Sequence, residues 1–209
     1  MSVRIENLVT SGTFSLDGGT WDVDNNIWIV GDDSEVIVID PAHSPTAVAE
    51  AVGDRTVKAI LLTHGHDDHI RAVSETRQLL GADVYLHDAD RMLWDAVFPD
   101  SAPDHAIEDG DTFEVAGASL TALHTPGHSP GSVCFHLESE ATLFSGDTLF
   151  KGGPGATGRS YSSFETIIDS IKSRLLTLPA ETTVNTGHGD ATSIGAEAPH
   201  LDEWITRGH

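Results

Sequence analysis

The feature that most constrains this chain is the heptapeptide Thr63–His69, which reads THGHDDH. It follows Ile60-Leu61-Leu62, an apolar run typical of a strand that is buried on both faces. Loops at strand ends often carry function because the sheet holds them rigidly while their tips face solvent. Three histidines and two aspartates in one such turn are not ordinary loop composition, so we expect the turn to bind cations.

Four other stretches repeat this local pattern, in which a histidine or an aspartate follows a predicted strand. They are VIDPAH (38–43), HTPGHSPGS (124–132), FSGDTLF (144–150) and NTGHGD (185–190). Glycine or proline stands beside the polar residue in each of them. A lone His-x-His is a weak signal, whereas this motif followed by partners in several later loops is a strong one.

Imidazole nitrogen and carboxylate oxygen are both zinc ligands, at about 2.0–2.2 Å from the metal. His64 and His66 are two residues apart, so a tight extended turn can direct both at one metal. Asp68 and His69 stand at a predicted helix start and can point at a second metal. Three separate loops can complete the set, with His128, Asp147 and His188.

The order of these motifs resembles the metallo-β-lactamase superfamily, and most of all its short glyoxalase II-like (hydroxyacylglutathione hydrolase-like) metallo-hydrolases. The resemblance runs from VIDPA to TGHGD and so spans nearly the whole chain. It implies an α/β (α+β) fold, the αββα sandwich, with two mixed β-sheets flanked by helices. The metals would lie at one edge, between the sheets.

Carried over residue by residue, the resemblance implies a first metal held by His64, His66 and His128. It implies a second metal held by Asp68, His69 and His188. Asp147 would bridge the two metals, and Asp68 would also be catalytic, orienting a water and accepting its proton. Asp40 would hydrogen-bond a metal-bound histidine from behind, as such ligands normally require. The implied cofactors are two divalent metal ions, with zinc expected and iron or manganese also compatible with these ligands.

The resemblance further implies an enzyme that cleaves an acyl or hydroxyacyl thioester of a small thiol by a metal-bridging hydroxide. Only about twenty residues follow His188, enough for one helix, so we expect no helical glutathione-binding domain and leave the thiol carrier open. Two other reactions stay open. One is a mononuclear-iron persulfide dioxygenase using His64, His128 and Asp147, and the other is a dinuclear-metal lactonase.

A glycine-rich loop, KGGPGATG (151–158), follows Asp147. Its region offers three residues that can contact the substrate, namely Lys151, Arg159 and Tyr161. A contact with a substrate carboxylate or with the thiol carrier is one reading of these residues. An exposed loop is the other.

Composition restricts the partners more than the fold. The 209 residues fit one domain (1–209), and 33 acidic against 11 basic residues give a net charge of −22. Such a charge repels nucleic acid, so we expect a small-molecule thioester substrate and no nucleic-acid partner. No apolar run approaches the roughly 20 residues that span a bilayer, so we expect no membrane partner. A single cysteine, Cys134, and no signal-peptide pattern predict a cytoplasmic protein, whose oligomeric state stays open.

Three helices are predicted near these motifs. One runs from His69 to Leu80 and ends at Gly81. A second has apolar residues at three- and four-residue steps from Phe164 to Leu178, with Ser162 and Glu165 forming a capping box. A third covers residues 197–207.

Overall fold

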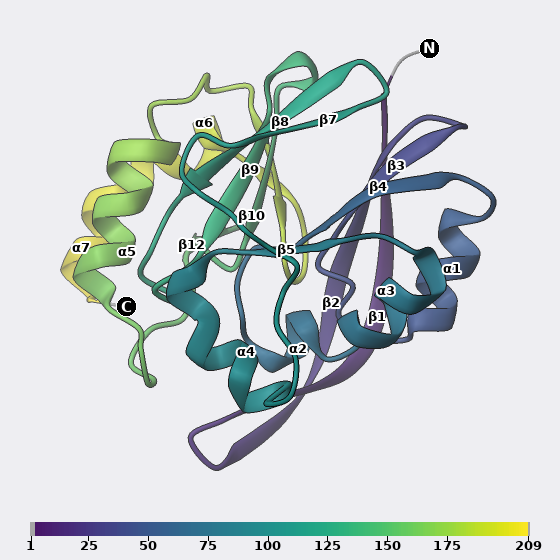
Figure 1. Cartoon of the computed structure of the whole chain (residues 1–209). Coiled ribbons are helices and arrows are strands. Elements are labelled where there is room, and N and C mark those ends of the chain that lie inside the picture. Colours follow the sequence, from purple (N-terminus) through teal and green to yellow (C-terminus); the bar gives the residue numbers. More distant parts are fainter. Residues whose placement is uncertain (1–2, 209) are drawn as a thin grey trace.

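A computed structural model describes residues 3–208, and two six-stranded sheets form its centre (Figure 1). In spatial order the first sheet contains β1 (Arg4–Leu16), β2 (Gly19–Gly31), β3 (Glu35–Ile39), β4 (Thr56–Leu61), β5 (Val84–Leu86) and β6 (His105–Ala106). The first two pairs of neighbouring strands are antiparallel and the other three are parallel. The first sheet is therefore mixed, as predicted.

The second sheet is mixed as well. In spatial order it contains β14 (Thr192–Ser193), β13 (Thr183–Thr186), β10 (Thr142–Gly146), β9 (Val133–Leu137), β8 (Ala118–His124) and β7 (Thr112–Val115). Only β10 and β13 run parallel. A small hairpin of β11 (Leu149–Phe150) and β12 (Gly153–Pro154) follows β10.

Helices cover the outer face of each sheet (Figure 1). The first sheet is covered by α1 (Pro45–Val52), α3 (Val73–Leu80) and α4 (Arg91–Val97). The short helix α2 (Asp67–Ile70) precedes α3, and the turn η1 (Asp88–Asp90) precedes α4. On the second sheet lie α5 (Phe164–Ser170), its π-helical extension η3 (Ile171–Leu175), α6 (Ile194–Glu197) and α7 (Leu201–Arg207); short 3₁₀ turns are η2 (Glu138–Glu140) and η4 (Ala198–His200). This arrangement is the predicted αββα sandwich.

The strand β3 shows why the sequence folds in four layers. Its residues alternate between faces, so Val36 and Val38 pack under the helices while Ile37 and Ile39 pack between the sheets. All four side chains are fully or almost fully buried. A strand that is covered on both faces needs apolar residues at every position, which explains the continuous run VIVI.

The predicted helix from His69 to Leu80 is wrong in one respect, because the structure divides it into α2 and α3. The Ala72 amide donates to the carbonyl of Ala42, 3.2 Å away, instead of continuing the helical ladder. This hydrogen bond breaks the helix after one turn. The second part does end at Gly81, which has a φ of 64°.

Two other helix predictions also need correction. Ser163 caps α5 by accepting the Thr166 amide, while Ser162 bonds to the loop before it. The last helix begins at Leu201 and not at residue 197, since Pro199 lies in the turn η4 and has no amide hydrogen to donate.

Strands β1 and β2 form a hairpin whose turn end extends beyond the rest of the first sheet (Figure 1). Asp17 at this turn accepts hydrogen bonds from the amide and hydroxyl of Ser160, at 3.0 and 2.7 Å. The Ser15 amide donates to Asp67 at 2.9 Å. The hairpin is thus attached both to the loop after Asp147 and to the start of α2. Within residues 3–208, no helix is both long and apolar enough to cross a membrane.

Candidate metal centre

The polar motifs meet at one edge of the two sheets. The turn Thr63–His69 follows β4, and Asp40 follows the parallel neighbour β3. In the second sheet Asp147 follows β10 and His188 follows its parallel neighbour β13, while His128 follows β8. Parallel neighbours end at the same edge of a sheet, so topology alone brings these loops together.

His64, His66 and His128, called here the three-histidine group, place one ring nitrogen each within 4.8 Å of one another. The side chains are buried, with residue exposures of 1%, 4% and 8%. Nδ1 of His66 lies 2.9 Å from Nε2 of His128. Within the part of the chain that the structure describes, Nε2 of His64 has no hydrogen-bond partner although it is buried.

Asp68, His69 and His188, called the mixed group, also place their ligand atoms within 4.8 Å of one another. Nε2 of His188 lies 3.2 Å from Oδ2 of Asp68 and 3.2 Å from Nε2 of His69. Asn25 donates from its amide to Oδ2 of Asp68 at 3.1 Å.

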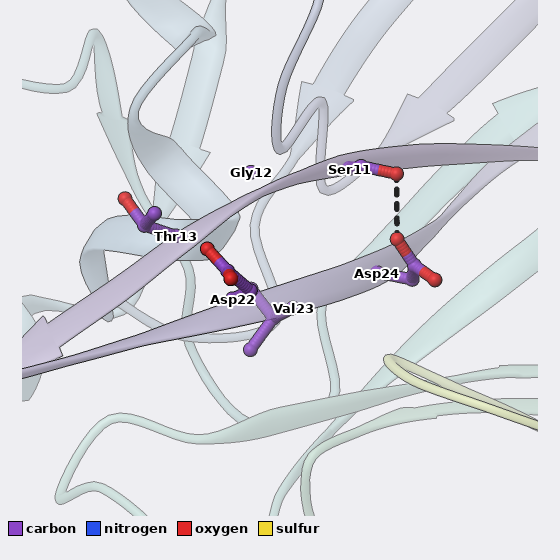
Figure 2. A pocket seen from close by; sticks show the side chains of 6 residues that line it. All are labelled: Ser11, Gly12, Thr13, Asp22, Val23 and Asp24. Carbon is purple, nitrogen blue, oxygen red and sulfur yellow. Dashed lines mark hydrogen bonds between the residues drawn. The ribbon is translucent and has the colours of Figure 1, made fainter.

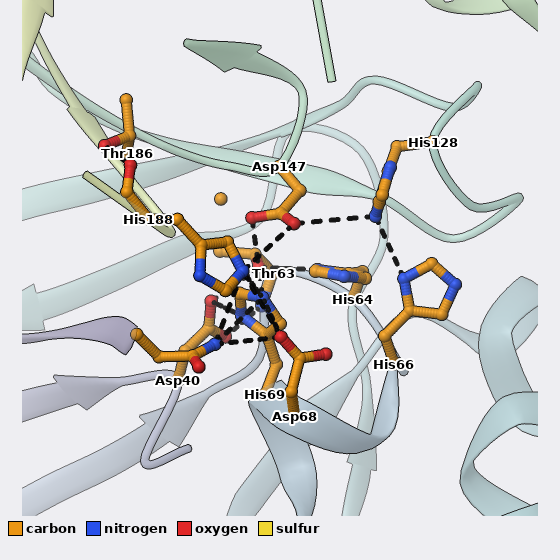
Figure 3. A network of polar contacts seen from close by, with 12 residues as sticks. Asp40, Thr63, His64, His66, Asp68, His69, His128, Asp147, Thr186 and His188 are labelled. Atoms are coloured by element: carbon orange, nitrogen blue, oxygen red, sulfur yellow. Dashed lines mark hydrogen bonds and ion pairs between the residues drawn. The ribbon is translucent and has the colours of Figure 1, made fainter. Parts of the chain in front are cut away.

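Asp147 lies between the two groups, as Figure 3 shows. Its Oδ1 is 3.4 Å from Nε2 of His69, and its Oδ2 is 3.4 Å from Nε2 of His188. The same Oδ2 lies 3.6 Å from Nε2 of His128 in the three-histidine group. One carboxylate therefore faces both groups.

Electrostatics differ between the groups. Burial, followed by the neighbouring histidines, holds the pKa of His64 well below its usual value, and burial lowers the pKa of His66 to about 3. Burial also opposes charge on His188, but Asp147 and Asp68 outweigh it and raise its pKa to about 10. Carboxylates likewise outweigh burial at His69 and raise its pKa well above the usual value.

The outer nitrogens of these histidines are held by fixed acceptors. Nδ1 of His69 donates to Asp40 at 2.9 Å, and Nδ1 of His188 donates to the carbonyl of Asp24 at 2.8 Å. Nδ1 of His128 donates to the carbonyl of Ala156 at 2.8 Å. Each bond directs the opposite nitrogen, Nε2, toward the centre of the site.

Asp40 is itself held in place. It accepts the Thr63 amide at 2.7 Å and the Thr63 hydroxyl at 2.6 Å, in addition to the His69 bond. Its position behind His69 is the one that the sequence analysis predicts for a residue that supports a ligand.

These contacts fit a dinuclear metal site. Two ring nitrogens face one another at 2.9 Å, the buried Nε2 of His64 has no hydrogen-bond partner among the described residues, and one carboxylate faces both groups. Cations placed among these atoms would satisfy all of them together. Imidazole and carboxylate ligands of this kind accept zinc, iron or manganese.

A cavity of about 140 Å³ opens onto both groups. It is lined by Phe14, Val23, His66, Asp68, His128, Asp147, Ala156 and His188. A larger open groove of about 390 Å³ lies on the β1–β2 hairpin and shares only Val23 with this cavity (Figure 2). Its lining contains Asp22 and Asp24 but no histidine. The chemistry therefore belongs to the smaller cavity.

The three predicted substrate residues lie in different surroundings. Lys151 pairs with Asp190 at 3.0 Å across an exposed surface. The Arg159 guanidinium stacks on Trp21, 3.9 Å from the ring centroid, and Phe14 of the cavity wall lies 5.9 Å away. Tyr161 is 57% exposed. Of the three, Arg159 has the contact that leads directly to the cavity.

Sequence reasoning missed three residues of the site. Asp67 holds the hairpin through Ser15 and pairs with Arg71. Asn25 belongs to the polar run DVDNN within β2, and no motif marks it. Asp90, in HDAD, is completely buried without any motif that marks it.

Comparison with known proteins agrees with this geometry. A model of the family described as "Metallo-beta-lactamase superfamily" matches residues 20–188. The "Probable metallo-hydrolase YqgX" of Bacillus subtilis is 36% identical over 186 residues, covering 82% of this chain and 88% of that protein. "Hydroxyacylglutathione hydrolase GloC" of Haemophilus influenzae is 32% identical over 187 residues, covering 82% and 87%.

Solved structures of similar proteins share the fold. The B3 metallo-beta-lactamase BLEG-1 is 31% identical, with a TM-score of 0.78 over 92% of this chain and 98% of that one. TTHA1623, solved in a di-iron-bound form, is 34% identical, with a TM-score of 0.75 over 84% and 93%. ETHE1 from Myxococcus xanthus is 26% identical, with a TM-score of 0.73 over 96% and 89%. By its family match, its relatives and its paired ligand groups, the chain belongs to the metallo-beta-lactamase superfamily.

Proposed function

We propose that the protein is a dinuclear-metal thioesterase that hydrolyses an acyl or hydroxyacyl thioester of a small thiol. The observation that carries the proposal is the pair of complete ligand groups joined by Asp147 and open to one cavity. Similarity to GloC, named a hydroxyacylglutathione hydrolase, supports the substrate class.

The proposed ligands are those that the structure brings together. The three-histidine group would hold the first cation, the mixed group would hold the second, and Asp147 would be a ligand available to both. We propose zinc as the native metal. Iron is the main competitor, because TTHA1623 binds two irons.

Two bound cations would supply a water of lowered pKa and an electrophilic contact for the thioester carbonyl. The chain's own residues orient this chemistry. Asp68 is 3% exposed and lines the cavity, where it can align a water and accept its proton. Asn25 fixes the Asp68 carboxylate by its hydrogen bond to Oδ2. Because a thiolate leaves readily, the site needs no strong general acid, and the cavity lining contains none other than the ligands.

Arg159 is the proposed contact for the thiol carrier. Its guanidinium lies over Trp21 and near Phe14, so it can meet an anionic group of a substrate whose thioester is in the cavity. Lys151, paired with Asp190, and Tyr161 remain secondary candidates.

The test is thiol release from a panel of thioesters, followed with a thiol-reactive dye. The panel contains lactoyl, formyl and acetyl esters of glutathione and of other small thiols, each with and without a chelator. We expect release that the chelator abolishes and that zinc restores. Metal-loaded protein that releases no thiol from any ester contradicts the proposal.

A second candidate is oxidation of a thiol persulfide, supported by the iron bound in the similar structure TTHA1623 and by a ligand set that suits iron. His64, His128 and Asp147 would then hold one iron. Oxygen uptake with glutathione persulfide by protein that holds one iron separates this reaction from hydrolysis. Opening of a lactone by the same dinuclear site is a third outcome, measured by acid release. The cytoplasmic location stays a prediction.

A further inference from the structure

Asp90 is a buried carboxylate that belongs to neither ligand group. It ends the turn η1 and precedes α4, on the first-sheet side of the site, and its exposure is 0%. A buried carboxylate is stabilised only where donors surround it, so its partners indicate its role.

All three partners of Asp90 come from two loops that carry histidines of the three-histidine group. Oδ2 accepts the amide of Gly65 at 2.8 Å, and Gly65 stands between His64 and His66. The same oxygen accepts the Ser129 hydroxyl at 2.6 Å, and Ser129 directly follows His128. Oδ1 accepts the amide of Gly131 at 2.6 Å.

Both loops have glycine where they approach Asp90. A Cβ atom on Gly131 would lie 2.7 Å from Cγ of Asp90. A Cβ atom on Gly65 would lie 3.1 Å from Cβ of Asp90 and 3.0 Å from Cβ of Leu93. Side chains at these positions would push the loops away from the carboxylate, so the two glycines allow the short hydrogen bonds.

We infer that Asp90 is a positioning residue that sets the distance between the His64–His66 turn and the His128 loop, and thereby the cation affinity of the three-histidine group. It acts through backbone amides and a serine and does not touch the imidazoles. Asp40, in contrast, bonds directly to His69 of the mixed group. The inference rests on the ligand set of the proposed function but not on the identity of its substrate.

The test compares two isosteric substitutions of buried carboxylates. Asp90→Asn places an NH₂ group opposite at least one of three donors, because Oδ1 and Oδ2 both accept. Glu197→Gln is the matched control. Glu197 is 4% exposed and accepts the Gly152 amide and the Thr192 hydroxyl, but none of its partners adjoins a histidine of the three-histidine group.

Both substitutions are made in a His188→Ala background, which leaves only the three-histidine group complete. Cobalt(II) affinity is measured by competition with a chromophoric chelator, and ligand-field absorption reports the geometry of the bound ion. We expect Asp90→Asn to weaken this affinity by about 10–100-fold and to change the absorption bands, as loss of a supporting partner does elsewhere. Glu197→Gln should leave both unchanged. In a His66→Ala background, which retains the mixed group, Asp90→Asn should leave cobalt affinity unchanged.

Thermal unfolding of the metal-free variants separates positioning from stability. Equal losses of Tm in Asp90→Asn and Glu197→Gln, with cobalt affinity unaltered in both, would overturn the inference. If Asp90→Asn does not fold, Ser129→Ala decides, since it removes one of the three donors, and an unchanged affinity and spectrum there also overturn it. Wild-type protein that binds two cations but cleaves no thioester would contradict the proposed function and leave this inference standing.

Discussion

The three-histidine group and the mixed group are neighbours, yet the chain prepares them for a cation in opposite ways. Burial keeps His64 and His66 of the first group neutral, with the pKa of His66 lowered to about 3. Asp147 and Asp68 give the second group negative charge, and the pKa of His188 rises to about 10. One group offers free lone pairs, while the other retains protons that a cation must displace.

The supports differ in the same way. The mixed group is held by direct bonds to its side chains, from Asp40 to His69 and from Asn25 to Asp68. The two ligand loops of the three-histidine group are tied together through their backbone and Ser129, by Asp90. Carboxylate and amide side chains thus support the mixed group directly, whereas Asp90 supports the three-histidine group through the loops that carry its ligands. The experiments below sharpen or break this contrast, from the largest expected effect to the smallest.

Removing the shared carboxylate should have the largest effect. Asp147→Ala should lower thiol release by more than about 100-fold, because losing even a supporting partner of a ligand costs about 10–100-fold. Metal analysis should show fewer than two cations per chain. Asp202→Ala, which changes an exposed aspartate on α7, is the control and should keep wild-type activity. Full activity in Asp147→Ala would refute the bridging role.

Asp40→Asn should affect the mixed group more than the three-histidine group, because Asp40 bonds directly to His69 but reaches His64 only through Thr63. The substitution keeps the size of the side chain, and asparagine tolerates the positive φ of 49° at this position. It removes the charge that faces Nδ1 of His69, so cation affinity of the mixed group should fall by about 10–100-fold. Competition titrations in the His66→Ala background measure this loss. An equal loss in the His188→Ala background would mean that the groups are not supported separately.

The pH dependence of binding should separate the groups directly. At neutral pH His64 and His66 are uncharged, so they should release no protons when a cation binds between about pH 6 and about pH 9. His188 is protonated below its raised pKa of about 10, so each proton displaced from the mixed group should raise affinity by about tenfold per pH unit over this range. Calorimetry in buffers of different ionisation enthalpy counts the released protons. Equal proton release by both groups would contradict the contrast.

Arg159→Ala should have the smallest effect. Loss of an exposed guanidinium contact costs about 1 kcal/mol, so KM for an anionic thioester should rise by about fivefold while kcat stays unchanged. Arg159→Lys keeps the charge and should recover part of the loss. A fall in kcat without a change in KM would place Arg159 in the chemistry and not in carrier binding.

Much of this molecule could be predicted from short-range patterns. The glycine after α3 is a local signal that predicted where this helix ends. The order of the histidine motifs carries the family resemblance, and this resemblance predicted the four layers and the loops that meet at the site. The break between α2 and α3 could not be predicted, because it follows from a hydrogen bond between Ala72 and Ala42. The role of Asp90 could not be predicted for the same reason, because two of its three donors, at residues 129 and 131, lie far from it in the sequence. The third donor is at residue 65.

The positions of the ligands along the chain have a consequence for folding. The three-histidine group joins a turn after β4 to a loop after β8, and the mixed group joins the start of α2 to a loop after β13. Neither set exists until the two sheets have docked, so cations that bind these sets bind the native state and not the unfolded chain. A free cation at about 100 times its dissociation constant would then add about 2.7 kcal/mol to the free energy of unfolding. Metal that is available during synthesis would therefore stabilise the assembled sandwich and would not direct the early steps of folding.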